Sequence, residues 1–330
     1  MDYVKINTQQ QQVEALLANI VPQIDIDKVI NDIQKLRITK SCLNGLELNK
    51  NMCASGSLWG YFPHFMDVSV SGRSLADKLN NPTAKSQLIA KTIAYCNKYE
   101  NEKISRNRVF QSLKAYNGHH VSNFRPSAAK DLYLDLVGKN AAIFDPCAGW
   151  GGRLLGALGA ECTTYVGVDA SIKTVNGFNQ LIYDLNLDNC SMQHDAIEDL
   201  IIKTPFADIA FTSPPYFNAE EYSLDTEQSC VRYKSYAEWT TKFLAPLCLQ
   251  MSLAIDIGGY VAINIADTKK YQLCEDTNKY LANLGLRYEK TYRYIMSSIA
   301  GKGIKFENIY VYKKIGAVKK VKDLFNDAIA

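Results

Sequence analysis

The segment DPCAGWGGR, residues 145–153, has the composition of a ligand-binding turn. It follows the apolar stretch 141–144 and leads into the helical pattern LLGALGA. Glycine tolerates backbone conformations that side chains forbid, so a strand, a glycine-rich turn and a helix N-terminus let the backbone approach a ligand closely. Dinucleotide folds hold a pyrophosphate at such a place. The carboxylate of Asp145, however, suits a cationic amino group better than a phosphate, which favours S-adenosylmethionine over NAD.

Two further carboxylates follow predicted strands. The segment VGVDAS places Asp169 at the carboxyl end of the neighbouring strand, where its side chain can accept hydrogen bonds from both ribose hydroxyls. A helix cap that includes Ser171 is the alternative interpretation. Asp195, in SMQHDAIEDL, ends a third predicted strand and can accept a hydrogen bond from the amino group of an adenine.

A second turn is formed by Ser213, Pro214, Pro215 and Tyr216, directly after the apolar stretch 208–212. Two consecutive prolines cannot continue a sheet ladder, so the chain leaves the sheet rigidly at its carboxyl edge. That edge is where open α/β sheets bind ligands. The turn presents the Ser213 side chain and the Pro214 carbonyl as hydrogen-bond acceptors, and Tyr216 supplies a ring on which a planar base can stack.

The elements that must position these groups are short apolar strands that alternate with amphipathic helices. Strands buried on both faces are expected at 141–144, 164–168, 208–212 and 259–265. This alternation predicts a parallel sheet covered by helices. The stretches 286–296 and 307–314 read as an antiparallel pair that closes the sheet edge.

The first third of the chain has a different pattern. Apolar residues recur at helical spacing near Val13 and Leu88, and no strand ladder is evident. Residues 55–72 combine several aromatic residues with Gly, Ser and Pro. We interpret this segment either as a loop that docks on another part of the molecule or as a small satellite core.

Composition restricts the class of protein. The 330 residues are 47% hydrophobic and 22% charged, which is typical of a packed globular protein. No uncharged apolar run of about 18 residues predicts a membrane span, and the N-terminus does not resemble a signal peptide. Nine cysteines without a CxxC pair argue against a disulfide framework or a zinc site, and favour a reducing cytosol. The net charge is +3, and residues 1–120 hold 15 Lys and Arg against 10 Asp and Glu. This excess indicates either a polyanionic partner or a solvated surface.

These segments together resemble the amino-group DNA methyltransferases that use S-adenosylmethionine, and more broadly phage and bacterial methylase-like proteins. DPCAGWGGR resembles the cofactor loop called motif I, and TSPPY resembles motif IV in the form typical of cytosine-N4 enzymes. The segment 121–133, VSNFRPSAAKDLY, resembles motif X, which in the family helps hold the methionine end of the cofactor. The order X, I, IV is that of the gamma arrangement. The similarity extends over roughly residues 115–315.

The resemblance implies roles for individual residues. Asp145 would bind the methionine ammonium, Asp169 the ribose, and Asn123, Arg125 and Ser127 the methionine carboxylate, although Arg125 could instead be a structural ion-pair partner. The implied cofactor-binding set is Asn123, Arg125, Ser127, Asp145, Cys147, Ala148, Gly149, Gly151, Asp169, Ala170 and Asp195. The implied catalytic set is Ser213, Pro214, Pro215 and Tyr216. We interpret Cys147 as a packed small residue, because carbon-5 cytosine methylation needs a thiolate at the fourth strand instead.

The expected reaction is transfer of a methyl group to an exocyclic amine of a DNA base, with N4 of cytosine favoured. The base would be flipped from a duplex and would stack on Tyr216 or Phe217. The alternatives are N6 of adenine, RNA, a glutamine amide in protein, and a protein that binds nucleic acid without catalysis. No metal is required.

Recognition of a nucleic acid is expected from the N-terminal region and from the polar loop 218–236. A helix over 103–114 would bring together Lys103, Arg106, Arg108 and Lys114, although a solvated helix face is the alternative. His119 and His120 are interpreted as a surface pair or as phosphate contacts.

The sequence therefore predicts an α/β protein with a class I methyltransferase (Rossmann-like) fold. Its sheet would be mostly parallel and seven-stranded, with an antiparallel edge hairpin. A mainly helical N-terminal domain is expected at 1–115, and the methyltransferase domain at 116–330.

Overall fold

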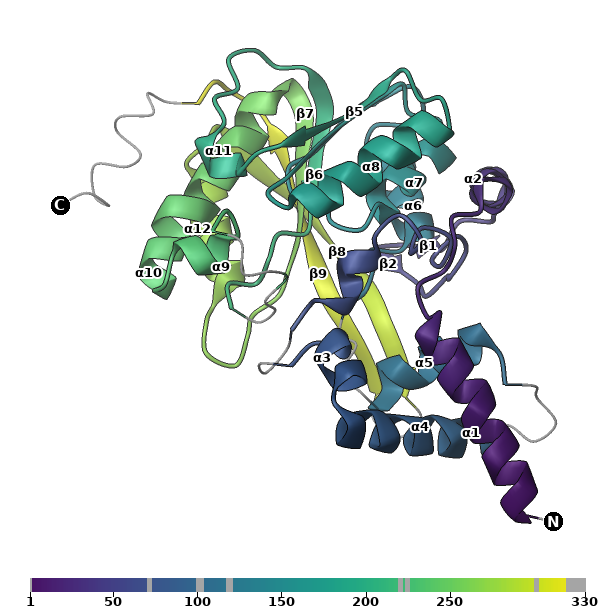
Figure 1. Ribbon diagram of the computed structural model, residues 1–330. Coiled ribbons are helices and arrows are strands. Elements are labelled where there is room, and N and C mark those ends of the chain that lie inside the picture. The colour runs from purple at the N-terminus through teal and green to yellow at the C-terminus, as the bar shows by residue number, and fades with distance from the viewer. Residues whose placement is uncertain are drawn as a thin grey trace.

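The computed structural model describes residues 2–69, 73–98, 104–116, 121–218, 222, 226–299 and 303–318. Within these residues a nine-stranded sheet has the order β1-β2-β8-β9-β7-β6-β3-β4-β5 (Figure 1). The strands are β1 (Leu43–Asn44), β2 (Glu47–Leu48), β3 (Ala142–Asp145), β4 (Thr164–Asp169), β5 (Cys190–His194), β6 (Ala207–Thr212), β7 (Ile255–Ile265), β8 (Leu286–Ile299) and β9 (Gly303–Lys314).

The direction of the strands follows the sequence-based prediction. Strands β5, β4, β3, β6 and β7 are parallel neighbours, and β9 lies antiparallel between β7 and β8. The expectation of a mostly parallel sheet closed by an antiparallel hairpin is confirmed.

The predicted number of seven strands is wrong. The pair β1–β2, which comes from the N-terminal third, extends the sheet beyond β8, and the Arg293 backbone N–H donates to the Leu46 carbonyl at 2.8 Å. Each of these two strands has only two residues. An alternation of apolar and polar residues needs four or more positions to be seen, so no pattern in the sequence reveals them.

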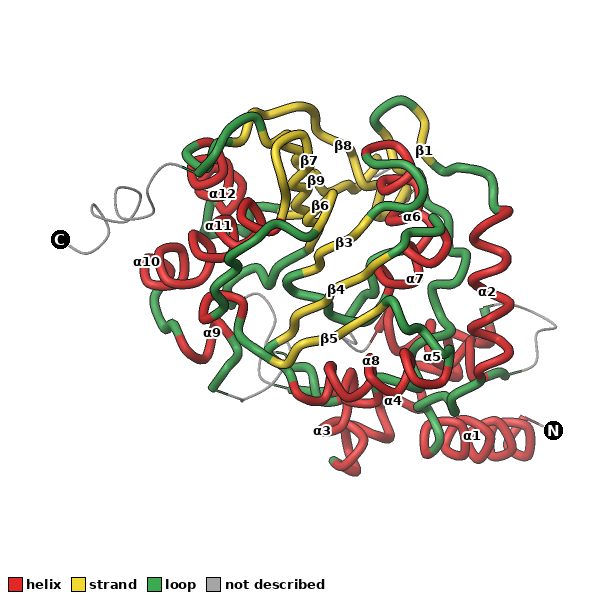
Figure 2. Tube along the Cα trace, turned by 90° about the horizontal axis from the view of Figure 1, so that it is seen from above, coloured by secondary structure: helices red, strands yellow, loops and turns green. Residues whose placement is uncertain are grey.

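Helices cover both faces of the sheet (Figure 2). The α-helices are α1 (Asp2–Ala18), α2 (Ile26–Ile38), α3 (Leu75–Asn80), α4 (Pro82–Asn97), α5 (Arg106–Tyr116), α6 (Pro126–Leu136), α7 (Gly152–Gly159), α8 (Ile172–Asp184), α9 (Ser229–Arg232), α10 (Tyr236–Trp239), α11 (Ala245–Ala254) and α12 (Leu273–Ala282). The 3-10 helices η1 (Pro63–Met66) and η2 (Ile197–Asp199) and the π-helix η3 (Thr240–Leu244) complete the helical elements. None of the helices in the described ranges is long and apolar enough to cross a membrane.

Each face of the sheet has its own hydrophobic core. Along β3, the side chain of Ile143 belongs to the core under α6, α7 and α8, whereas Phe144 belongs to the core under α11 and α12. Both side chains are buried, which is why the strand reads as a continuous apolar run. This double cover holds the carboxyl ends of the parallel strands rigidly at one edge.

The helices of the N-terminal third divide between two cores. Residues of α1, α4 and α5 pack in a third cluster with Trp59 and Phe65. In contrast, Val29 and Leu36 of α2 pack in the sheet core that α6, α7 and α8 cover. Figure 1 shows α1, α3, α4 and α5 grouped below the sheet, while α2 lies beside α7. The domain boundary near residue 115 stays a prediction.

The aromatic segment 55–72, which the structure describes as far as residue 69, connects these cores. Trp59 and Phe65 belong to the N-terminal cluster, and Tyr61 and Phe62 belong to the sheet core, where the rings of Phe62 and Phe178 have centroids 5.3 Å apart. Both interpretations of the segment therefore apply, because it forms a satellite core and also docks on the sheet. The docking is close: a Cβ on Gly177 of α8 would lie 2.3 Å from the Tyr61 carbonyl oxygen.

The close approach at Gly177 predicts the sign of a stability change. Gly to Ala inside a helix normally stabilises, but in Gly177→Ala the new methyl group would collide with backbone. We expect the free energy of unfolding to fall by about 1–3 kcal/mol. Denaturant titration measures it, and Gly56→Ala, with open space at the Cβ position, is the control that changes stability by less than about 0.5 kcal/mol. A more stable Gly177→Ala variant would contradict the packing described.

Candidate active site

A cavity of about 540 Å³ lies at the carboxyl edge of the parallel strands. Eleven of the predicted site residues line it, from five separate stretches of the chain. They are Asn123, Arg125, Cys147, Gly149, Asp169, Ala170, Asp195, Ser213, Pro214, Pro215 and Tyr216. The structure therefore brings the two turns and the segment before α6 to one place.

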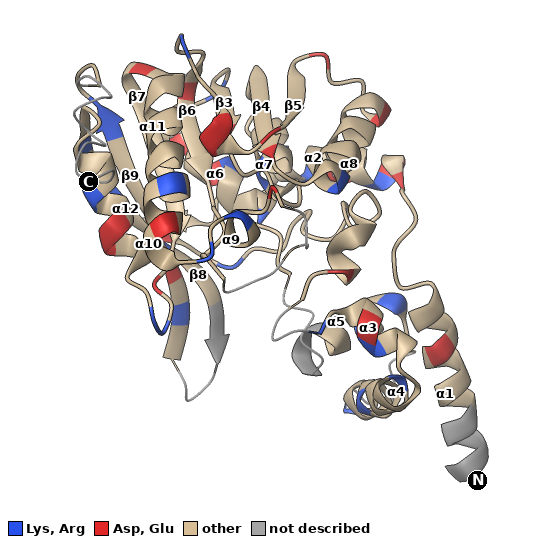
Figure 3. Ribbon diagram, turned by 60° about the vertical axis from the view of Figure 1, so that its left-hand side comes forward, with Lys and Arg blue, Asp and Glu red and all other residues tan. Residues whose placement is uncertain are grey.

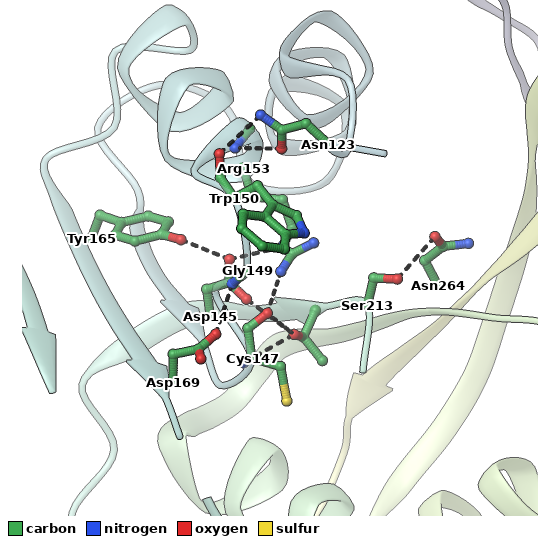
Figure 4. A network of polar contacts seen from close by, with 12 residues as sticks. Asn123, Asp145, Cys147, Gly149, Trp150, Arg153, Tyr165, Asp169, Ser213 and Asn264 are labelled. Atoms are coloured by element: carbon green, nitrogen blue, oxygen red, sulfur yellow. Dashed lines mark hydrogen bonds and ion pairs between the residues drawn. The ribbon is translucent and has the colours of Figure 1, made fainter. Parts of the chain in front are cut away.

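Asp145 lies beneath the cavity and is not part of its wall. Its carboxylate is fully buried and accepts hydrogen bonds from Arg153 Nε at 2.7 Å, Tyr165 Oη at 2.6 Å and Thr212 Oγ1 at 3.0 Å (Figure 4). The prediction that Asp145 contacts the ligand ammonium is therefore not supported, because the residue is fully buried, does not line the cavity and already pairs with Arg153. The missed partner is Arg153, whose place in the same glycine-rich segment was the available signal.

The glycines of the turn have different functions. Gly149 has φ +63°, lines the cavity, and donates its N–H to Asp169 Oδ2 at 2.9 Å. Gly151, at φ +79°, faces the N-terminal segment instead, since a Cβ there would lie 2.7 Å from Leu58 Cδ1. Ala148 is buried off the wall, and its N–H donates to the Val168 carbonyl. Gly151 and Ala148 are thus packing residues, contrary to the prediction.

The segment before α6 holds the start of α7. Asn123 Oδ1 accepts from the Gly152 N–H, and Asn123 Nδ2 donates to the Trp150 carbonyl, both at 2.9 Å. Asn123 therefore stabilises the turn and also lines the cavity. Ser127 does not line it, because its hydroxyl donates to the Asn51 carbonyl at 2.8 Å. The prediction that Ser127 binds a carboxylate is not supported.

Arg125 is a buried cation with unused donors. Its side chain is 5% exposed, its Nε donates to Tyr294 Oη at 3.0 Å, and its guanidinium lies 4.1 Å from the centroid of the Tyr294 ring. Both terminal nitrogens, Nη1 and Nη2, are buried and have no hydrogen-bond partner among the residues that the structure describes. A buried unpaired donor is costly, so a wall residue of this kind indicates an anionic ligand group. This contradicts the alternative of a structural ion pair for Arg125.

Two carboxylates lie together on another part of the wall. Asp169 accepts backbone N–H groups from Gly149 and Ser171, and the Asp195 N–H donates to the Asp169 carbonyl. Burial raises the pKa of Asp169 to about 6, although the two backbone hydrogen bonds act in the opposite direction. Asp169 is therefore ionised at neutral pH and can accept from ligand hydroxyls.

The proline turn forms a third part of the wall. Ser213 Oγ lies 3.3 Å from Asn264 Oδ1, and Tyr216 Oη lies 3.2 Å from Glu307 Oε2. Phe217 has φ +53° and is 3% exposed, and it packs against Trp239, whose ring centroid is 5.7 Å away. The prediction that Phe217 stacks on a substrate is therefore wrong, because the chain turns its ring into the core.

Residues from the N-terminal third complete the cavity; the sequence allows the segment 55–72 to dock on another part of the molecule, but does not predict that it lines a ligand site. Ser55, Trp59 and His64 line it, and the Ser55 hydroxyl is buried without a hydrogen-bond partner. The His64 ring lies 4.8 Å from the Trp150 ring, and its Nε2 is 3.0 Å from Thr174 Oγ1. Burial lowers the pKa of His64 to about 4, so this ring is neutral at pH 7.

Cysteine chemistry does not fit the site. Burial, together with the nearby carboxylates of Asp169 and Asp145, raises the pKa of the Cys147 thiol well above its usual range. A thiol that resists ionisation is a poor nucleophile. Across the described ranges, no group of three or more His, Cys, Asp and Glu side chains could hold a metal ion.

Of the predicted recognition residues, Arg106 and Arg108 are described, and neither lines the cavity. Arg106 and Arg108 are on α5, and Arg108 Nη1 donates to Gln111 Oε1 at 3.2 Å. Figure 3 shows Lys and Arg interspersed with Asp and Glu over the sheet and the helices. Lys103, His119, His120 and the side chain of Lys114 lie outside the described residues, as does part of the loop 218–236.

Comparison with known proteins gives structural likenesses only. No family model matches the chain, and no curated protein matches it. The crystal structure of TrmN from Thermus thermophilus has a TM-score of 0.41 and 15% identity, over 58% of this chain and 49% of that chain. This chain thus spans about half of the TrmN chain.

Two further solved structures are matched over their whole length. A methyltransferase from Pyrococcus furiosus has a TM-score of 0.43 and 13% identity, over 71% of this chain and 100% of that chain. An rRNA methylase from Streptococcus thermophilus has a TM-score of 0.39 and 14% identity, over 59% of this chain and 100% of that chain. The fold is described by the order and direction of its strands, which the structure shows directly.

Proposed function

We propose that this protein transfers a methyl group from S-adenosylmethionine to an exocyclic amino group of a nucleic-acid base. The observation that carries the proposal is that one cavity contains three complementary groups. They are the Asp169 and Asp195 carboxylates, the unpaired guanidinium of Arg125, and the Ser213–Tyr216 turn. These groups match the ribose and adenine, the methionine carboxylate, and the amine that receives the methyl group.

The unpaired polar groups of the cavity are suited to bind the methyl donor. The two free nitrogens of Arg125 can form a bidentate pair with a carboxylate, and the unpaired Ser55 hydroxyl can add a further donor. Asp169 would accept from the ribose hydroxyls, and Asp195 from the adenine amino group. Asp145 would act indirectly, because it fixes the turn through Arg153. The donor supplies a methyl group activated by a positively charged sulfur.

The protein's own contribution is to activate and align the amine. The lone pair of an exocyclic amine is delocalised into the ring, so the amine is a weak nucleophile. Ser213 Oγ and the Pro214 carbonyl can accept its hydrogens and draw the nitrogen toward a tetrahedral geometry. As the bond from nitrogen to the methyl carbon forms, the bond from that carbon to sulfur breaks. The positive charge passes to the nitrogen, which then loses a proton to solvent.

We take the target to be N4 of cytosine in DNA, because the Ser213 form of the turn is typical of cytosine-N4 enzymes. A base in a duplex would have to flip out at a cost of a few kcal/mol, partly offset by stacking on Tyr216. N6 of adenine and RNA are the alternatives.

The direct test uses isotopically labelled S-adenosylmethionine with duplex DNA, RNA or protein, followed by digestion and identification of the methylated nucleoside by mass. N4-methylcytosine from DNA is the expected product. In Ser213→Ala we expect transfer to slow by about 10²-fold or more, with cofactor affinity retained, because one amine acceptor is lost. The exposed Ser191→Ala is the control. Label in none of the three acceptors would refute the proposal and favour a protein that binds without catalysis.

The role of Arg125 is tested with two ligands that differ in the amino-acid tail. In Arg125→Met we expect the affinity for S-adenosylhomocysteine to fall by about 1.5–3 kcal/mol, which is roughly 10- to 150-fold. The affinity for 5′-methylthioadenosine, which has no carboxylate, should stay unchanged in the same calorimetric titration. Equal losses for both ligands would show that Arg125 only supports the fold.

The raised pKa of Asp169 predicts how binding depends on pH. Hydrogen bonds from ribose favour the carboxylate form, so affinity should be full above about pH 6 and fall by up to tenfold per pH unit below it. The suitable ligand is 5′-methylthioadenosine, because its lack of a tail removes the ligand's own amine titration. In Asp169→Asn we expect weaker binding that is independent of pH between 5 and 7. A wild-type affinity that stays constant over this range would remove Asp169 from ribose binding.

A further inference from the structure

Two residues that the proposed function does not use, Asn264 and Glu307, contact the hydroxyl groups of the turn. Asn264 is on β7, the last of the parallel strands, and Glu307 is on β9, its antiparallel neighbour. Both line the same cavity as Ser213 and Tyr216. Asn264 Oδ1 is an acceptor for the Ser213 hydroxyl, and Glu307 Oε2 is an acceptor for the Tyr216 hydroxyl, which also lies 3.5 Å from the Asn264 backbone carbonyl.

The orientation of the Asn264 amide is fixed by its neighbour. Its side chain is 2% exposed, and its Nδ2 donates to the Asn308 carbonyl at 3.1 Å. A carbonyl only accepts, so the reversed amide would place two oxygens against each other. The oxygen Oδ1 therefore faces Ser213. Since Oδ1 cannot donate, the Ser213 hydroxyl is the donor across the 3.3 Å contact.

The Tyr216 hydroxyl is held in a similar way. A carboxylate only accepts, so Tyr216 is the donor across the 3.2 Å contact to Glu307 Oε2. Burial and the Glu307 charge raise the pKa of Tyr216 well above its usual range, whereas a hydrogen bond from Ser213 acts in the opposite direction. The phenol therefore keeps its proton. The Ser213 proton has two acceptors within the protein, Asn264 and Tyr216.

The backbone adds to the same polarity. Pro214 and Pro215 have no N–H group, so the turn has no backbone donor at these two positions. The groups left to meet a ligand are the lone pairs of the Ser213 hydroxyl and the Pro214 carbonyl. Both can accept hydrogen bonds from an NH₂ group, and neither attracts a carbonyl oxygen.

We propose that Asn264 and Glu307 are positioning residues that hold the hydroxyl protons of Ser213 and Tyr216, so that the turn selects a heterocycle with an amino group and rejects the analogue with a keto oxygen. This inference rests on the proposed function and adds to it the property by which the substrate is chosen. When a carbonyl group occupies a site built for an NH₂ group, the acceptors of the site lose their hydrogen bonds and face the lone pairs of the carbonyl oxygen. Cytosine would therefore be accepted in preference to uracil.

The test compares Asn264→Ala, Glu307→Ala and Glu307→Gln by single-turnover methylation and by equilibrium binding of flexible oligonucleotides that contain cytosine or uracil. In both Ala variants we expect the methylation rate to fall about tenfold with the KM for the cofactor unchanged, and the preference for cytosine over uracil in binding to fall by a similar factor. Glu307→Gln keeps an acceptor oxygen, so it should recover most of the rate lost in Glu307→Ala.

A matched control is Asn278→Ala. Asn278 Oδ1 also accepts from a tyrosine hydroxyl, that of Tyr312, but away from the cavity. This variant should methylate at the wild-type rate and keep the preference for cytosine.

The possible results separate the two proposals. A wild-type protein that labels no acceptor overturns the proposed function and this inference together. A wild-type protein that methylates, with Asn264→Ala and Glu307→Ala equal to it in rate and in preference, overturns only this inference. Loss of activity in Glu307→Gln as large as in Glu307→Ala also overturns it, because the negative charge and not the acceptor would then matter.

Discussion

The buried ion pair between Asp145 and Arg153 is the interaction on which the site depends. One carboxylate at the end of β3 accepts from Arg153 at the start of α7, from Tyr165 on β4 and from Thr212 on β6. The pair therefore ties three adjacent strands and one helix together at the edge where the cavity opens. A buried charge of this kind is costly unless it is paired and hydrogen-bonded, and here one cation and two hydroxyl donors contact it. The Asp145–Arg153 pair thus fixes the positions of the residues that line the cavity without lining up its own carboxylate with the ligand.

Part of the cavity wall comes from the N-terminal third of the chain. Residues from the N-terminal third, among them Trp59 and His64, lie against the turn that follows β3. Both rings pack with Trp150, which itself packs against the N-terminal cluster and against the sheet core. The N-terminal third is thus more than a separate recognition unit, because the ligand-binding wall is incomplete without it.

The site is organised by hydrogen-bond polarity. Carboxylates face the part proposed for ribose and adenine, an unpaired guanidinium faces the part proposed for a carboxylate, and the proline turn presents acceptors. Each part is complementary to one group of the proposed ligands, and none needs a thiolate, whose formation burial opposes at Cys147. In the role proposed for them, Asn264 and Glu307 make the part of the site that meets the substrate complementary to an amino group.

The sequence predicts those features of the fold that depend on residues close together in the chain. Continuous apolar runs located the strands, and glycine and proline located the two turns at their ends, since these patterns reflect local backbone geometry. Contacts between distant segments decided the rest. Asp145 is satisfied by side chains up to 67 positions away, and Tyr216 meets Glu307 at a separation of 91, so neither partner leaves a local pattern. The burial of Phe217, the added strands β1 and β2, and the orphaned donors of Arg125 likewise exist only once the chain has folded. Residue type fixes which hydrogen bonds a side chain can make, but only the tertiary structure decides which of them are already used.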